Sequence, residues 1–108
     1  MATKDIFDTE IPNRIKAKPE LAKDINAVVH FNITGEGGGT WTLDATKTAD
    51  WITAGASGEP KMVITATAAD FEKIVTKQMN AQMAAMSGKL KFKPMDMGIA
   101  MKLGKLIG

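Results

Sequence analysis

The chain has 108 residues, a net charge of +2 and no cysteine. Its length and its hydrophobic share of 44% are those of an ordinary globular domain, so we expect a single domain over residues 1–108. The lack of cysteine excludes disulfides, thiolate catalysis and zinc–thiolate sites. The net charge is too small to indicate a nucleic-acid partner, and no run of about 18 apolar residues is present that could cross a membrane.

Charge and methionine are both unevenly distributed. Residues 73–108 hold seven lysines and one acid, Asp96, whereas residues 1–72 carry a net charge of −4. A basic C-terminal third is compatible with transient contact with an anionic membrane surface and with a solvated lysine-rich face, of which the second is commoner. Six of the eight methionines lie between Met79 and Met101, where they serve either as core filler or as a flexible binding wall.

The two ends of the chain were compared with signals that determine subcellular location. The first ten residues include acids and lack the apolar segment of a secretory signal. The final residues, Leu106, Ile107 and Gly108, differ from the Ser-Lys-Leu peroxisomal ending. We therefore expect a cytoplasmic location with no C-terminal peroxisomal signal. The sequence does not define the oligomeric state, for which a monomer is the expectation.

The N-terminal segment, residues 5–26, has helical periodicity. Phe7, Ile11 and Ile15 recur at every fourth position and share one helical face. Asp8 or Thr9 is expected to cap the first helix shortly before Pro12. Pro19 predicts a restart as a second short helix over Glu20–Ile25.

Strand periodicity follows. Apolar residues alternate with polar ones in residues 28–35 and again in residues 40–44, and the glycines between them predict a hairpin turn. Residues 47–53, around Trp51, form a weaker strand candidate, and residues 61–67 form another strand. Four strands in succession place this part of the chain in one sheet.

The C-terminal third returns to helices. Residues 70–86 are predicted to be helical, with a break near Met79 and Asn80, and Gly88 is a typical residue after a helix end. Residues 89–93 alternate as a strand that Pro94 stops, and residues 97–107 form an apolar helix. The order of helix, four strands, helix, strand and helix predicts an α+β fold with helices packed on one face of a single sheet.

Catalytic and metal-binding patterns are not found. His30, the only histidine, alternates with the apolar strand positions and has no orienting carboxylate or nucleophile in a recognisable pattern. The glycines of residues 35–39 join two strands, unlike a phosphate-binding loop. We expect no metal, no cofactor and no enzymatic activity. Trp41 is interpreted as core, and a stripe of Met79, Met83 and Met86 fits a helix core better than a cavity wall on periodicity alone.

Nearly the whole chain resembles the sterol carrier protein 2 family. Residues 86–92 (MSGKLKF) and 97–103 (MGIAMKL) are similar to the family's "F-x-x-G-K-L-K-I" and "M-G-L-A-M-K-L". Asn80-Ala81-Gln82 with Ala84 is similar to its "N-P-x-x-A". The hairpin of residues 29–44 and the strand–helix segment of residues 62–71 also match, in the same order and spacing.

This resemblance implies a five-stranded mixed β-sheet with helices packed on one face, enclosing an apolar tunnel. The expected ligand is a fatty acid, an acyl-CoA, a sterol or another long apolar molecule. The link of residues 93–96 departs from the family pattern, which bears on the shape of the pocket mouth. The expected ligand-binding residues are Phe71, Val75, Met79, Gln82, Met83, Met86, Leu90, Phe92, Ile99, Ala100, Met101 and Leu103.

Three functions remain open at this point. The leading one is a non-enzymatic intracellular lipid-binding or lipid-transfer protein, whose affinity comes from burying hydrocarbon at about 0.8 kcal/mol per methylene. The second is an accessory domain that presents a lipid-like substrate to a separate enzyme. The third, an enzyme acting on a small apolar substrate, would need a second titratable group near His30 or clustered carboxylates, and the sequence shows neither. Gln82 is equally consistent with a pocket wall and with a solvent-facing position.

Overall fold

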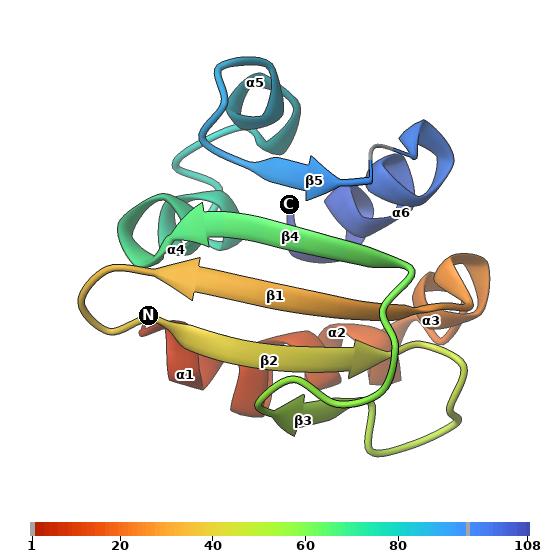
Figure 1. Cartoon of the computed structure of the whole chain (residues 1–108). Helices are drawn as coiled ribbons and strands as arrows, with labels where there is room; N and C mark the ends of the chain where they lie inside the picture. Colours follow the sequence, from red (N-terminus) through yellow and green to blue (C-terminus); the bar gives the residue numbers. More distant parts are fainter. Residues whose placement is uncertain (1, 95) are drawn as a thin grey trace.

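A computed structural model describes residues 2–94 and 96–108, so Met95 of the unusual link lies outside the described residues. The sheet has five strands in the order β3-β2-β1-β4-β5 (Figure 1). Neighbouring strands are antiparallel except for the central pair of β1 and β4, which is parallel. The strands are β1 (Val28–Thr34), β2 (Gly39–Asp44), β3 (Ile52–Ala54), β4 (Met62–Thr67) and β5 (Lys91–Lys93). The expected five-stranded mixed sheet of an α+β fold is thus confirmed.

Helices cover one face of this sheet. On β1, Val29, Phe31 and Ile33 are buried beneath them, whereas Asn32 and Thr34 on the opposite face are exposed. The alternation follows from the two-residue period of a strand. The helices are α1 (Thr3–Asp5), α2 (Ile11–Ala17), α3 (Glu20–Ile25), α4 (Ala68–Val75), α5 (Ala81–Met86) and α6 (Met97–Ile107). No helix in the described ranges is both long enough and apolar enough to span a bilayer.

The N-terminal helix begins earlier than the sequence predicts. The helix begins at Thr3 with Ala2 at the N-cap position, so neither Asp8 nor Thr9 caps it as predicted. Glu72 of α4 accepts both the backbone N–H and the hydroxyl of Thr3, at 3.0 and 2.7 Å, and so holds this first residue. A π-helical turn, η1 (Ile6–Glu10), joins α1 to α2 directly before Pro12. Proline lacks the N–H that an α-helical turn requires, so a wider turn before it is expected. The restart after Pro19 as α3 is confirmed.

Four aromatic rings fill the space between the sheet and the N-terminal helix. The ring of Phe7 stacks on Trp41 at a centroid distance of 4.4 Å and on Phe71 at 5.3 Å. Phe31 meets Phe7 edge-on at 5.1 Å. All four residues are buried, so Trp41 belongs to the core as predicted. The part of the core around these four rings is therefore closely packed, as protein interiors normally are.

The C-terminal third has the predicted elements: α6 has the predicted bounds, α4 begins two residues earlier, and β5 is shorter than predicted. The helix expected over residues 70–86 is two helices, α4 and α5, separated by residues 76–80, which confirms the predicted break. Asn80 caps α5 by accepting the N–H groups of Gln82 and Met83. Gly88 has a φ of 80° just after α5 ends, where glycine is favoured. Of the weak strand candidate at residues 47–53, only residues 52 and 53 belong to a strand, β3 (Ile52–Ala54), and Trp51 precedes it.

Candidate functional site

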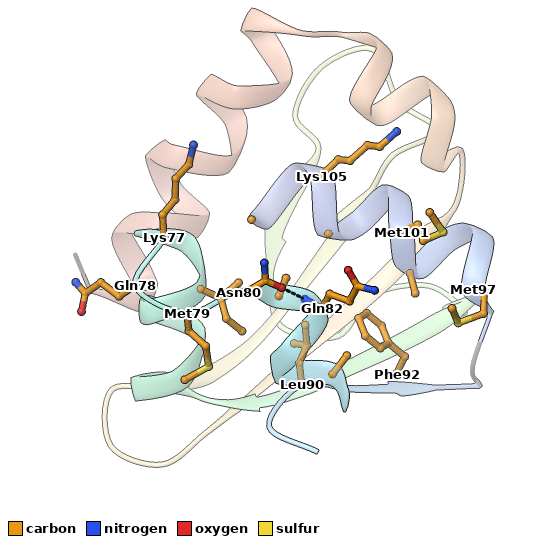
Figure 2. Close-up of a pocket in the computed structure, with 16 residues that line it drawn as sticks. Lys77, Gln78, Met79, Asn80, Gln82, Leu90, Phe92, Met97, Met101 and Lys105 are labelled. Atoms are coloured by element: carbon orange, nitrogen blue, oxygen red, sulfur yellow. Dashed lines mark hydrogen bonds between the residues drawn. The ribbon is translucent and has the colours of Figure 1, made fainter. Parts of the chain in front are cut away.

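A pocket of about 660 Å³ lies between α5, α6 and β5 (Figure 2). It is at the β5 edge of the sheet, beyond the aromatic core, and the link between α4 and α5 closes one of its sides. Among the described residues, its walls come from residues 74–108: Ile74, Lys77, Gln78, Met79, Asn80, Ala81, Gln82, Ala85, Leu90, Phe92, Met97, Ala100, Met101, Gly104, Lys105 and Gly108.

One face of α6 forms a wall that combines small residues with two methionines. Met97, Ala100, Met101 and Gly104 recur at intervals of three and four residues and so share one side of the helix, and Gly108 follows directly after its end. A Cβ atom added at Gly104 would meet no heavy atom within 4 Å, which shows open space beside the helix. The pocket therefore exists where glycine and alanine leave room that larger side chains would fill.

The opposite wall is apolar and comes from the sheet edge. Leu90 is buried and Phe92 is half-buried, and both side chains line the pocket. Ile74 of α4 and Ala85 of α5 extend the same lining. This composition suits hydrocarbon, because ligand pockets with mostly apolar walls bind by burying apolar surface.

Polar groups lie around the apolar walls. Gln82 lines the pocket from α5 and is also exposed to solvent, so it is both a wall residue and a solvent-facing one. The Asn80 side chain is already engaged in capping α5. Lys77 and Lys105 are the charged residues of the lining, and no acid is among the described residues that form it. The lining therefore carries positive charge, which favours a ligand with an anionic group.

Six of the twelve predicted ligand-binding residues meet in this pocket: Met79, Gln82, Leu90, Phe92, Ala100 and Met101. Four others, Phe71, Val75, Ile99 and Leu103, are buried in the core instead. Ile99 and Leu103 lie on the side of α6 that packs inward, which is a different side from the pocket wall. Ligand binding by any of these residues stays a prediction.

The predicted wall of Met79, Met83 and Met86 is not formed. The helix is interrupted between Val75 and Ala81, so Met79 lies in the link and shares no helical stripe with the other two. On α5 the side that lines the pocket carries Ala81, Gln82 and Ala85. Met83 and Met86 are 69% and 82% exposed.

Sequence reasoning missed ten lining residues, and one signal could have found some of them. The repeat of small residues at every fourth position, Ala100 and Gly104 on α6 and Gly108 after its end, marks a line along the helix that lacks large side chains. A helix packed against a neighbour on that face would place larger apolar residues there. The residues of the α4–α5 link, such as Lys77 and Gln78, carried no comparable signal because their position depends on the break between the helices.

His30 lies away from the pocket, on β1. Its Nε2 atom lies 2.9 Å from the carbonyl oxygen of Ser57, so the ring is engaged with the backbone of the β3–β4 connection. Within residues 2–94 and 96–108, no group of three or more His, Cys, Asp or Glu side chains is arranged to hold a metal ion. The pocket itself is lined by amides, lysines and apolar groups.

The chain is similar to parts of larger curated proteins. It is 39% identical over 93 residues to hydroxysteroid dehydrogenase-like protein 2 of Xenopus tropicalis, which covers 82% of this chain and 21% of the relative. It is 41% identical over 102 residues to peroxisomal multifunctional enzyme A of Dictyostelium discoideum, which covers 92% of this chain and 23% of the relative. The chain thus spans about a fifth of the length of these relatives.

Solved structures share the fold. Sterol carrier protein 2 of Yarrowia lipolytica in its apo form matches with a TM-score of 0.68 and 29% identity, over 95% of this chain and 81% of that one. Palmitated SCP2L2 of Aedes aegypti matches with a TM-score of 0.78 and 23% identity, over 99% and 95% of the two chains. Residues 9–108 match the SCP-2 sterol transfer family as a whole. The chain therefore belongs to the SCP-2 sterol transfer family.

Proposed function

We propose that this protein is a non-enzymatic lipid carrier that holds a long apolar molecule in the pocket between α5, α6 and β5. The observation that carries the proposal is the pocket itself: about 660 Å³ of space with apolar walls, made by glycine and alanine on α6. Cavities that bind small molecules usually measure about 300–1,000 Å³ and have such walls. Family membership and the palmitated relative with the same fold support a lipid as the occupant.

The apolar walls are sufficient for useful affinity. Burying ten methylenes contributes roughly 8 kcal/mol before the entropic cost of binding, by the usual increment per methylene. Lys77 and Lys105 add positive charge at the pocket, so a fatty acid or an acyl-CoA suits the lining better than an uncharged lipid. Selectivity among chains would be broad, since apolar contacts discriminate weakly between neighbouring lengths.

A second function is favoured by the comparisons. The relatives that this chain resembles over about a fifth of their length have names of enzymes, a dehydrogenase-like protein and a multifunctional enzyme. The same pocket would then present a lipid-like substrate to a catalytic unit. The two functions differ in one measurement: a carrier moves a fluorescent lipid between vesicles unaided, whereas a presenting domain raises the turnover of a partner enzyme on a lipid substrate.

A substitution at Gly104 tests the pocket. Gly104→Leu should leave the free energy of unfolding unchanged or raise it by up to about 1 kcal/mol, because glycine is a poor helix former. Its side chain should occupy ligand space, and displacing two methylenes of ligand removes about 1.6 kcal/mol, or roughly tenfold in affinity. Displacement of a fluorescent fatty acid measures the affinity, and urea unfolding measures the stability.

Gly98→Leu is the matched control. Gly98 lies on the same helix, outside the pocket lining, and its added Cβ would meet only the Asp96 side chain at 3.4 Å. Because Gly98 does not line the pocket, the affinity of Gly98→Leu should equal that of the unsubstituted protein. Equal loss of affinity in both variants would contradict the assigned site. Failure of the unsubstituted protein to bind any fatty acid, acyl-CoA or sterol probe at micromolar concentration would overturn the carrier function.

A further inference from the structure

Exposed methionines gather at one end of the molecule. Among the described residues, the large hydrophobic side chains that are exposed are Met83, Met86, Met97 and Met101, at 69%, 82%, 66% and 64%. They belong to α5 and α6; in Figure 1, α5 and β5 lie at the top, beyond β4, and α6 lies beside them on the right. Clustered exposed apolar side chains mark surfaces that are covered by a partner. Flexible, polarizable methionine suits a partner without a fixed shape.

Lysines accompany these methionines. Residues 77–105, which include the four methionines, hold six exposed lysines: Lys77, Lys89, Lys91, Lys93, Lys102 and Lys105. The acid of this stretch, Asp96, accepts the backbone N–H of Ile99 at 3.1 Å and so caps α6. The stretch of chain that carries the exposed methionines therefore has a net positive charge, which is complementary to an anionic partner.

We propose that this end of the molecule docks on the anionic surface of a lipid bilayer. The docking surface is defined by the four exposed methionines and the six lysines. Lysines near an anionic leaflet each strengthen partitioning about fivefold, and apolar side chains that enter the interface add to this attraction. Both kinds of group are present together here, and each would be weaker without the other.

A second copy of this chain fits the surface less well. A symmetric dimer brings the same patch together from both subunits. The lysines of one copy would then face the lysines of the other, and like charges across an interface are unfavourable. A phospholipid surface supplies both the negative charge that the lysines need and the apolar interior that the methionines need.

The pocket and the docking surface share residues. Met97 and Met101 line the pocket and are also two of the four exposed methionines. Docking would therefore bring the pocket against the bilayer from which a lipid is taken. The docking proposal goes beyond the carrier function, since the lysines and methionines would bind a bilayer whether or not the pocket accepts a ligand.

Two charge-reversal variants with the same net charge test the electrostatic part. The first carries Lys89→Glu, Lys93→Glu and Lys102→Glu, which are exposed and outside the pocket lining. The second carries Lys4→Glu, Lys16→Glu and Lys47→Glu, exposed on α1, on α2 and in the β2–β3 loop. Co-sedimentation with vesicles of phosphatidylcholine and phosphatidylserine at low salt should show a loss of at least about 100-fold for the first variant. The second should lose much less.

Insertion of the methionines is tested by fluorescence. The chain has no cysteine, so Met86→Cys gives a single site for a polarity-sensitive label, and Thr48→Cys in the β2–β3 loop gives a matched control. On vesicles that contain phosphatidylserine, the label at position 86 should shift to the blue and brighten, while the label at position 48 should not change.

Three results would overturn the proposal. One is equal binding to pure phosphatidylcholine and to anionic vesicles at low salt. Another is an equal loss in the two charge-reversal variants, which would mean that only net charge matters. The third is a solution mass of a dimer that Met83→Ser with Met86→Ser converts to a monomer, which would make this end a contact between copies. Circular dichroism of every variant confirms that the fold is kept.

Discussion

Arg14 connects three helices through its guanidinium group. From α2 it donates to the carbonyl oxygen of Val75 at the end of α4 and to that of Leu106 near the end of α6, both at 2.9 Å. These carbonyls have no partner within their own helices, and positive charge is favourable at helix C-termini. Glu10 accepts from the same side chain at 2.9 Å. One residue thus joins the N-terminal helix to α4 and α6, which both contribute residues to the pocket lining.

Removing this guanidinium should destabilise the protein. Arg14→Leu is expected to lower the free energy of unfolding by about 2 kcal/mol, because it leaves two helix-terminal carbonyls unpaired. Arg14→Lys should recover little, since one ammonium group cannot reproduce the two directed bonds. Urea unfolding measures both variants. Lys16→Leu, an exposed neighbour on α2, is the control, and a loss there equal to that of Arg14→Leu would contradict the role of Arg14.

The two lysines of the pocket lining should recognise an anionic headgroup. Lys77→Gln with Lys105→Gln is expected to weaken binding of a long-chain fatty acid about fivefold at low salt, corresponding to about 1 kcal/mol for exposed charges. Binding of the fatty alcohol with the same chain should not change. The two affinities come from displacement titrations. Lys89→Gln with Lys102→Gln removes the same charge outside the lining, and an equal loss there would show that the effect is not local.

At the scale of elements, most of the fold could be predicted from the sequence, because the spacing of apolar residues shows which side of a helix or strand is buried. The faces of β1 and the whole of α6 follow directly from alternation and helical spacing. The start of the first helix was predicted wrongly because it depends on Glu72, which is distant in sequence. Half of the predicted site lies in the pocket, including Leu90 and Phe92. The predicted wall of Met79, Met83 and Met86 is not formed, because residues 76–80 separate α5 from α4.

Helix α5 is short and has few buried residues to hold it in place. It has six residues, buries only Ala84 fully and depends on Asn80 for its cap. Helices this short are not stable without tertiary contacts. We expect its amides to exchange with solvent faster than those of β1, and to gain protection when a fatty acid binds, because Ala81, Gln82 and Ala85 line the pocket.

The substitution Asn80→Ala tests whether α5 is less stable than the rest of the fold. Loss of the cap is expected to cost about 1 kcal/mol, confined to α5. Hydrogen exchange by mass spectrometry should show faster exchange over residues 81–86 and unchanged exchange over β1. Asn13→Ala, at an exposed position on α2, is the control. Uniformly faster exchange across the sheet, or no protection of α5 by ligand, would contradict α5 as the mobile wall of the site.

At the scale of the whole molecule, the two halves have different roles. The half built by the N-terminal helices, β2 and β3 is filled by Phe7, Phe31, Trp41 and Phe71. The half at β5 contains the pocket. The parallel pair of β1 and β4 joins them at the centre of the sheet. The buried core is continuous across both halves, and the pocket lies at its β5 edge, where open space does not interrupt the aromatic packing.

The contacts of Arg14 with Val75 and Leu106 have a consequence for engineering. Every described lining residue of the pocket falls within residues 74–108, and Arg14 holds that segment through backbone oxygens. These two hydrogen bonds do not depend on which side chains the segment carries, whereas its buried residues, such as Leu103 and Ile107, pack in the core. Replacing residues 74–108 by those of a relative, with the buried residues kept, should therefore exchange the ligand preference while the rest of the fold is retained.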